Sequence, residues 1–141
     1  MLNHALLHPQ LLAALASSGH GGQILLADGN YPYTTIKHPQ ADVVYLNLSP
    51  GLVGVDDVLR ALLDTTPVEA ATFMRSPEGD AVPAHEDYRA LLGPAVTITE
   101  AERFDFYDEV RRPSVATVVA TADTRICANL LLTIGVRAPD A

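Results

Sequence analysis

Residues 17–32 read SSGHGGQILLADGNYP, and this stretch decides how the rest of the chain can be arranged. Its apolar run, from Ile24 to Ala27, is too short for a helix and predicts a buried strand. Asp28 follows at the carboxyl end of that strand, where ligands bind in open α/β sheets. His20 precedes the strand among glycines, which leave the backbone free to bend. The stretch therefore predicts a titratable imidazole and a carboxylate that lie close together at a pocket.

The bulk composition predicts a single domain over residues 1–141, because 141 residues of which 48% are hydrophobic can bury a real core. No apolar run approaches the roughly 20 residues that a membrane helix needs. The first residues, Met1 to His4, lack the basic and apolar regions of a signal peptide. The single cysteine, Cys127, excludes an internal disulfide and indicates a reducing compartment. We therefore expect a cytoplasmic protein.

The formal net charge of −8 bears on possible partners. Nucleic-acid binding requires Lys and Arg to neutralise phosphates, so this charge argues against nucleic acid and against an acidic membrane surface. A small neutral or polar ligand is the expectation that remains.

Predicted helices and strands alternate along the chain with short connections. This alternation predicts an α/β fold with a mostly parallel sheet that is covered on both faces. Residues 129–136 are compatible with a strand or with a buried helix. The predicted helices are 9–17, 55–64, 83–92 and 100–111, and the predicted strands are 24–27, 42–48, 68–74, 95–99 and 115–121.

Each candidate site residue in the opening stretch also has an ordinary structural role. His20 can exchange a proton near neutral pH, but it can equally cap helix carbonyls or face solvent. Asp28 can bind ligand hydroxyls or orient His20, but it can also form an Asx-turn over Gly29 and Asn30.

Two further groups of candidates lie later in the chain. Arg103 and Tyr107 are four residues apart on a predicted helix, so they share a face and can line a pocket. The alternative is that Phe104 and Tyr107 pack in the core while Arg103 stays in solvent. Asp123 and Asn129 flank a loop after the strand at 115–121, where both ligand binding and ordinary turn or boundary roles are open.

Motifs for metal or nucleotide chemistry are missing from the sequence. The other four histidines have no ligand spacing with each other or with His20. No Gly-x-Ser-x-Gly elbow, phosphate loop or dinucleotide fingerprint is present. We therefore expect neither a metal nor a cofactor.

Four short motifs, in order, give the chain a resemblance to a known family. They are the helix that leads into Gly19-His20-Gly21; the strand that closes with Ala27-Asp28 and is followed by Tyr31-Pro32; the stretch Arg103-Phe104-Asp105-Phe106-Tyr107; and Asn129-Leu130-Leu131-Leu132 before Gly135-Val136. On these motifs the chain resembles the ribose pyranase/fucose mutarotase family, and is closer to its fucose mutarotase branch. The resemblance runs nearly from end to end.

The resemblance implies an isomerase that interconverts cyclic forms of a free monosaccharide without a cofactor. It implies a three-layer α/β/α fold assembled into a homo-oligomeric ring, typically a decamer. The pocket would lie at a subunit boundary, with the segment around Asn129 supplied by a neighbouring subunit.

The resemblance also assigns roles to residues by position. His20 matches the general acid/base, with Asp28 and Tyr107 as further catalytic candidates. Asp28 and Arg103 match sugar-binding positions, and the segment Cys127-Ala128-Asn129 matches the part that closes the pocket. The chain departs from the family at three pocket positions: the family commonly has histidine at Asn30, glutamate at Asp123 and tyrosine at Cys127.

Mutarotation requires a proton delivered to the ring oxygen and another removed from the anomeric hydroxyl. One histidine can serve one end of this reaction, and a carboxylate, another residue or water can serve the other. Two alternatives remain open: a non-catalytic sugar-binding or regulatory ring, and an isomerase or lyase that acts on another small carbonyl compound.

Overall fold

Strand β1 (Gln23–Ala27) lies in the interior of a six-stranded sheet in the structure, a computed structural model that describes residues 1–140. The strand order is β2-β5-β1-β6-β3-β4. Among the described strands β6 alone runs antiparallel to its neighbours, β1 and β3. The other pairings, β1 with β5, β2 with β5 and β3 with β4, are parallel. The predicted α/β class with a mostly parallel sheet is confirmed.

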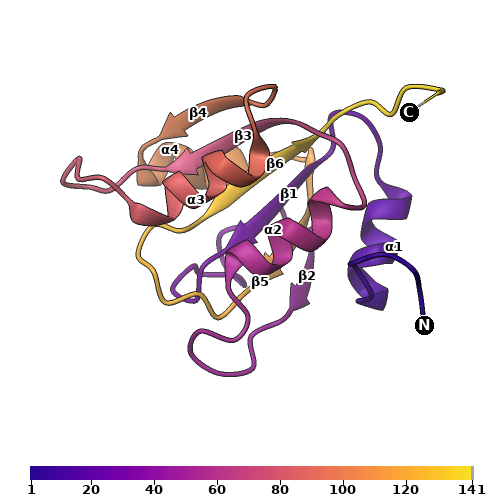
Figure 1. Ribbon diagram of the computed structural model, residues 1–141. Coiled ribbons are helices and arrows are strands. Elements are labelled where there is room, and N and C mark those ends of the chain that lie inside the picture. Colours follow the sequence, from indigo (N-terminus) through magenta and orange to yellow (C-terminus); the bar gives the residue numbers. More distant parts are fainter. Residues whose placement is uncertain (141) are drawn as a thin grey trace.

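Helices cover both faces of this sheet. Figure 1 shows α2 and α3 on one face and α4 on the other, which gives the three layers that the resemblance implied. The remaining elements, in chain order, are α1 (Pro9–Ser17), β2 (Asp42–Tyr45), α2 (Val55–Leu63), β3 (Val68–Met74), α3 (Pro83–Leu92), β4 (Thr97–Ala101), α4 (Arg103–Val110), β5 (Val115–Ala120) and β6 (Leu130–Ile134).

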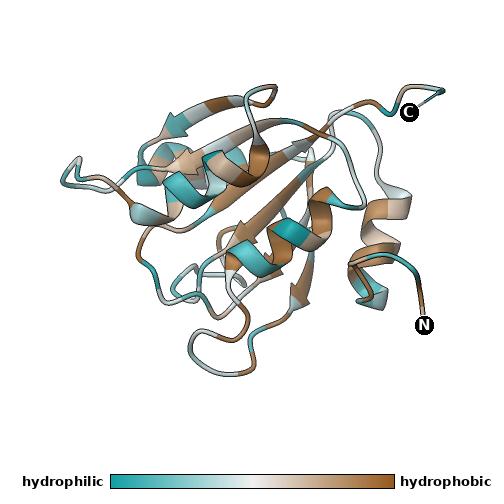
Figure 2. Cartoon of the chain, viewed as in Figure 1, coloured by the Kyte–Doolittle hydropathy of each residue, from teal (hydrophilic) through white to brown (hydrophobic). Residues whose placement is uncertain are grey.

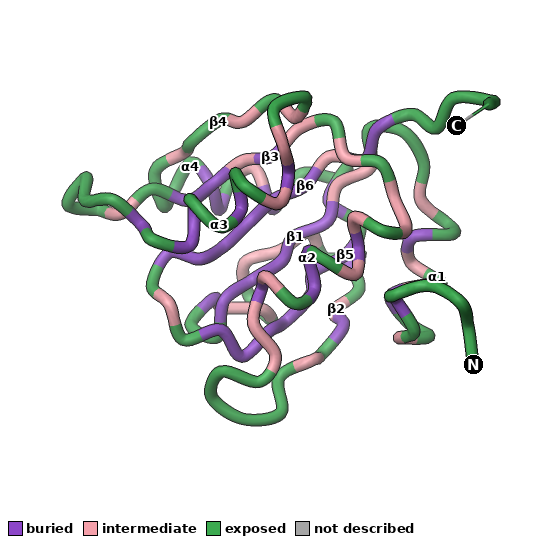
Figure 3. Tube along the Cα trace, in the orientation of Figure 1, coloured by how far each residue is buried: buried purple, intermediate pink, exposed green. Residues whose placement is uncertain are grey.

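The core lies around the central strands, which are buried on both faces. Figure 2 shows β1, β5 and β6 as largely hydrophobic, and Figure 3 shows the same strands as largely buried. Strands covered on both faces carry continuous apolar runs rather than alternating ones. The run Leu130–Leu132 follows this rule, so β6 is a strand and not the buried helix that the sequence left open.

Several predicted boundaries were wrong, by two or three residues in β2, β4 and α4 and by one residue in β1, α2 and β5. The strand β2 ends at Tyr45 rather than at Leu48, because the chain turns there into the loop that pairs with the end of β5. The strand β4 begins two residues later than predicted, where its pairing with β3 begins. The last helix, α4, starts at Arg103 rather than at Glu100, because residues up to Ala101 belong to β4 and Glu102 is the N-cap.

Two loops lie close together at the carboxyl ends of β1 and β5, and we refer to this region of the molecule as the site edge. The Gly29 N–H donates to the Asp123 carbonyl oxygen at 2.8 Å. A Cβ atom at Gly29 would lie 3.1 Å from that same oxygen, so glycine permits this contact. The loops after β1 and β5 are thereby joined next to Asp28.

In the described part of the chain, no helix combines the length and the hydropathy that a membrane crossing requires.

Candidate functional site

Asp28 is the centre of the candidate site, at the carboxyl end of β1. Its side chain is almost fully buried, with 2% exposure. Its Oδ1 accepts the Asn30 N–H at 2.9 Å, and its Oδ2 accepts the Ala128 N–H at 3.2 Å. The Asx-turn that we considered for Asp28 is therefore present, but it uses only one of the two carboxylate oxygens.

Asn129 forms a reciprocal pair with Asp28. The Asn129 Nδ2 donates to Asp28 Oδ2 at 3.1 Å, and the Asp28 N–H donates to Asn129 Oδ1 at 2.8 Å. Because β6 runs antiparallel to β1, the residue that precedes β6 lies beside the residue that follows β1. Asp28 and Asn129 of the same chain therefore form this pair, and the expectation that the segment around Asn129 serves a pocket at a subunit boundary stays a prediction.

Burial is the largest influence on the Asp28 carboxyl. It raises the pKa of Asp28 above the usual value, and the nearby negative charge of Asp123 adds to the effect. The hydrogen bonds from Asn30 and Ala128 act in the opposite direction but do not outweigh burial. Such a carboxyl can hold a proton at a higher pH than an exposed aspartate does.

Tyr33 supports the same edge, although sequence reasoning did not select it. Its hydroxyl lies 2.6 Å from the Asp28 carbonyl oxygen and 2.7 Å from that of Thr121, so its single proton is shared between these two acceptors. It therefore joins the ends of β1 and β5. Burial, together with the charge of Asp28, raises the pKa of Tyr33 to about 12, so the hydroxyl stays protonated as a donor.

Arg103 and Tyr107 lie on one face of α4, as predicted. The Arg103 Nε donates to the Tyr107 hydroxyl oxygen at 3.0 Å. The Tyr107 ring is buried and meets Tyr31 edge to face, with ring centroids 5.5 Å apart. The predicted packing of Phe104 in the core was wrong, because this ring is 71% exposed and lies beside Arg103 instead.

Two hollows open along this edge of the molecule. One, of about 430 Å³, is lined by residues that include Arg103 and Tyr107 of α4. The other, of about 510 Å³, is lined by the loops after β1, β2 and β5. Asn30 lines both hollows, and its N–H binds the buried Asp28 carboxylate. These hollows therefore offer polar groups and space for a small ligand beside Asn30, while the Asp28 carboxyl lies behind Asn30 and lines neither hollow.

Cys127 and Ala128 form the wall of the site rather than its polar lining. Cys127 is 9% exposed, has a positive φ of 59°, and has a thiol whose pKa is raised by burial. Ala128 is fully buried, and its N–H binds Asp28. The expected contact of these two side chains with a sugar is not available in the single chain, where both are covered.

His20 lies at the opposite end of β1, so the expected proximity of His20 and Asp28 was wrong within one chain. A five-residue strand spans about 16 Å. The His20 Nε2 instead lies 3.0 Å from a carboxylate oxygen of Glu69, at the start of β3. Both side chains are about half exposed. Glu69 was not found from the sequence, because nothing local relates residue 69 to residue 20.

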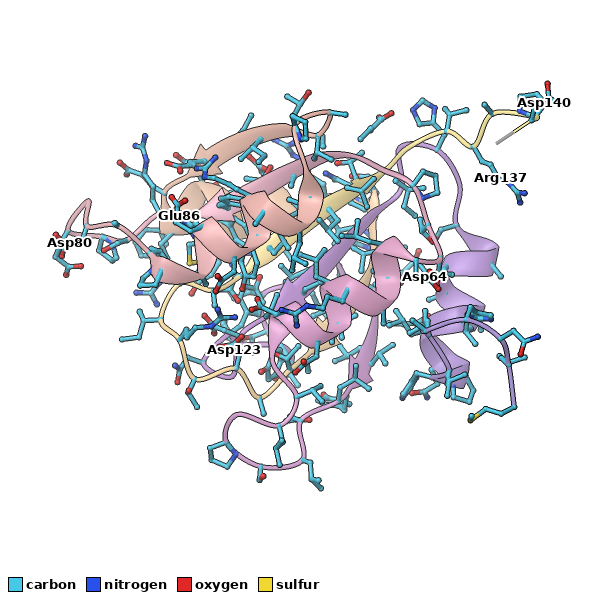
Figure 4. The ribbon with its side chains drawn as sticks, in the orientation of Figure 1. Asp64, Asp80, Glu86, Asp123, Arg137 and Asp140 are labelled. Carbon is cyan, nitrogen blue, oxygen red and sulfur yellow. The ribbon has the colours of Figure 1, made fainter. Side chains whose placement is uncertain are left out.

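Asp123 is buried at the start of the loop after β5, where Figure 4 labels it. Its Oδ2 accepts the Val55 N–H at the start of α2 at 2.9 Å. Burial alone would raise the pKa of Asp123, but hydrogen bonds from Arg125 and Val55 outweigh burial and lower it. Among residues 1–140, no cluster of His, Cys, Asp and Glu is arranged to hold a metal ion.

Comparisons with known proteins agree with this fold and extend over nearly the whole chain. The model of the RbsD / FucU transport protein family matches residues 1–137. Fucose mutarotase from Homo sapiens is 32% identical over 149 aligned residues, which cover 95% of this chain and 92% of that protein.

Two solved structures are also similar. FucU from Bifidobacterium longum has a TM-score of 0.80 at 32% identity, covering 93% of this chain and 95% of that one. Fucose mutarotase from Streptococcus pneumoniae, in complex with L-fucose, has a TM-score of 0.80 at 28% identity, covering 93% and 94% respectively. These findings confirm the resemblance seen in the four motifs: the chain belongs to the RbsD / FucU transport protein family.

Proposed function

We propose that this protein is a monosaccharide mutarotase, an isomerase that interconverts the cyclic forms of a free aldose such as L-fucose. The observation that carries the proposal is the buried Asp28, held by Ala128, Asn129 and Asn30, the last of which lines two adjacent hollows. The names of the similar proteins, fucose mutarotase from Homo sapiens and from Streptococcus pneumoniae, support the choice of reaction and sugar.

The proposed reaction consists of proton transfers and a bond rotation. An acid protonates the ring oxygen while a base removes the proton of the anomeric hydroxyl, and the bond between C1 and the ring oxygen breaks. The open aldehyde rotates about C1–C2, and the reverse transfers close the ring on the other face. The atoms of substrate and product are the same, so proton transfer alone suffices and the proposal includes no cofactor.

Asp28 is suited to one end of this reaction. Burial raises its pKa, so the carboxyl holds a proton to a higher pH than an exposed aspartate does and can serve as an acid or, once ionised, as a base. The N–H of Asn30 and the groups of Ala128 and Asn129 keep the carboxyl in one orientation. Its carboxylate can bind a sugar hydroxyl in the same place, which is the second role that we assign to it.

His20 is suited to the other end, and we propose that it acts in the site of a neighbouring chain. Within one chain it lies about 16 Å from Asp28 along β1, too far for one monosaccharide to touch both. Since the Glu69 carboxylate only accepts hydrogen bonds, the His20 Nε2 donates to it, and Nδ1 is the ring nitrogen left to exchange a proton with a ligand. The proposal therefore includes a homo-oligomer, with a ring such as a decamer as its fullest form.

Arg103 and Tyr107 are proposed to bind the sugar at the hollow beside α4. The Arg103 guanidinium is exposed there and can donate to ring hydroxyls, while its Nε holds the Tyr107 hydroxyl. Tyr107 is thereby placed as a further proton donor or acceptor. We assign Cys127 the part of a small wall residue, and we propose the cytoplasm, where its thiol stays reduced, as the site of action.

The test is NMR exchange spectroscopy of the anomeric protons of L-fucose, D-ribose and a panel of other aldoses. We expect the wild type to accelerate exchange of at least one sugar. His20→Ala and Asp28→Asn should each lower the rate by about 10²- to 10⁴-fold, the usual contribution of one acid/base group. His4→Ala, which changes an exposed histidine outside the site, should leave the rate unchanged.

The other outcomes separate the alternatives. Full activity of His20→Ala would contradict the mechanism. Saturation transfer from the protein to a sugar, without any accelerated exchange, would favour a non-catalytic sugar-binding ring. If no sugar in the panel exchanges faster and none binds, the remaining alternative is an isomerase or lyase that acts on another small carbonyl compound.

A further inference from the structure

The segment from Asp123 to Asn129 connects β5 to β6 without regular secondary structure. It nevertheless supplies two of the three groups that hold the Asp28 carboxylate, the Ala128 N–H and the Asn129 Nδ2. Irregular segments are usually more mobile than the elements that they connect. The orientation of Asp28 therefore depends on whatever fixes this segment.

Arg125 ties the segment to two helices. Its Nε and Nη2 donate to both carboxylate oxygens of Asp123, at 3.0 Å and 2.7 Å. Its Nη2 also donates to Asp56 of α2 at 2.9 Å, and its Nη1 donates to Asp87 of α3 at 3.1 Å. One guanidinium thus pairs with three carboxylates from three parts of the chain. The planar fork of arginine permits this arrangement, and a lysine ammonium could not reproduce it.

Tyr88 of α3 holds the same segment from inside the core. Its hydroxyl donates to the Ala128 carbonyl oxygen at 2.7 Å, and its side chain is fully buried. The Arg125 guanidinium lies over its ring, 5.8 Å from the centroid. One turn earlier on α3, the His85 Nε2 lies 3.3 Å from the Cys127 carbonyl oxygen. With these carbonyls bound to α3, the Ala128 N–H is directed towards Asp28.

We propose that Arg125 and Tyr88 are positioning residues, which act on the reaction by holding the Asp123–Asn129 segment so that Ala128 and Asn129 orient Asp28. Neither residue contacts the Asp28 carboxylate itself in the hydrogen-bond network described above. The consequence for the reaction rests on the proposed function, but the effect on the segment does not.

The first experiment measures hydrogen exchange of the backbone amides by mass spectrometry, on the full chain in its native assembly. We expect Tyr88→Phe and Arg125→Gln to accelerate exchange of the peptide that contains Ala128 about tenfold, the effect of losing roughly one hydrogen bond. Arg89→Gln is the matched control. Arg89 also pairs with a carboxylate, Glu100, and lies over a ring, that of Phe73, but it does not contact the segment.

This experiment tests the positioning role of Arg125 and Tyr88 without any measurement of activity. Exchange at Ala128 that is no faster in Tyr88→Phe than in the Arg89→Gln control would overturn it. Tyr88→Phe removes a single oxygen atom and keeps the ring, so it decides the question even where Arg125→Gln, which leaves three facing carboxylates, does not fold.

The second experiment measures the rate of anomeric exchange against sugar concentration for the same variants. We expect the saturated rate to fall about tenfold in Tyr88→Phe with little change in the sugar concentration at half saturation, because a misplaced group costs rate even where the ligand still binds. Equal loss in Arg89→Gln would overturn the inference by showing a general loss of structure. If no aldose exchanges faster with the wild type, the proposed function fails, and the hydrogen-exchange result still stands on its own.

Discussion

Asp28 combines two properties at the scale of a single residue. Its backbone N–H and its carboxylate both bind Asn129, so the residue is held at two points, and its carboxyl group is also buried enough for ionisation to be unfavourable. A carboxylate that is held but reluctant to ionise is a usual feature of acid/base sites. Its burial also makes the stability of the protein depend on pH.

This dependence gives a prediction for Asp28→Asn. The native pKa of Asp28 is raised above its ordinary value of 3.8, so the native state binds the proton more tightly than the unfolded state. The stability that Asp28 contributes is fully present below about pH 3.8 and is lost as the pH rises through the native pKa. We therefore expect the wild type, relative to Asp28→Asn, to lose free energy of unfolding with rising pH. Urea unfolding of both proteins across the acidic and neutral range measures this, and parallel curves would contradict it.

The sequence alone was enough to predict that His20 and Asp28 lie far apart within one chain. A strand of four residues, 24–27, was predicted between them, and an extended strand places the residues that flank it at opposite ends. The glycines before the strand made a bend possible but did not require one. By contrast, the pairing of His20 with Glu69 and that of Asp28 with Asn129 depend on which strands are neighbours, and local sequence does not determine that order.

At the scale of the elements, hydrophobic pattern was enough to find nearly every helix and strand. It was insufficient at the boundaries of strands, because pairing between strands determines where a strand begins and ends. The strand β4 begins at Thr97 because its pairing with β3 begins there. It was also insufficient for β6, since a short continuous apolar run fits a strand and a buried helix equally well. Burial on both faces, between β1 and β3, resolves this ambiguity.

The position of β6 predicts a large cost for truncating one of its side chains. Leu131 is 1% exposed, and its backbone pairs with Leu25 on one side and Thr72 on the other. We expect Leu131→Ala to lower the free energy of unfolding by about 2 to 5 kcal/mol through lost burial and the cavity left behind. Leu48→Ala, which truncates a leucine that is 84% exposed, should change it by less than about 0.5 kcal/mol. Chemical denaturation compares the two, and similar effects would refute the central place of β6.

At the scale of the whole molecule, the two proposed catalytic groups lie at opposite ends of the interior strand β1. One chain therefore carries Asp28 at one end of β1 and His20 near the other, and under the proposed mechanism a complete site needs two copies. Closed rings arise when a surface on one subunit fits a different surface on the next. The separation of the two groups within the chain is compatible with such head-to-tail contacts.

This arrangement predicts complementation between two inactive variants. His20→Ala and Asp28→Asn, each inactive alone, should regain activity when they are unfolded together and reassembled, because mixed contacts reunite a wild-type His20 with a wild-type Asp28. Random mixing of equal amounts restores about a quarter of the sites when each site draws one group from each of two chains. The rate of anomeric exchange measures it, with each variant reassembled alone as the control. A mixture that stays inactive would show that both groups act from the same chain.

The late position of the antiparallel strand β6 among the six strands affects how the chain folds during synthesis on the ribosome. Without residues 130–134 the sheet consists of two separate pieces, β2-β5-β1 and β3-β4. Those residues are translated after the other five strands, so neither piece can complete its pairing until they have been made. Asp28 is translated early but receives Ala128 and Asn129 only after a hundred further residues have been added. The nascent protein therefore completes its sheet and its site together, once β6 has been made, and until then its unpaired apolar strands are exposed to aggregation.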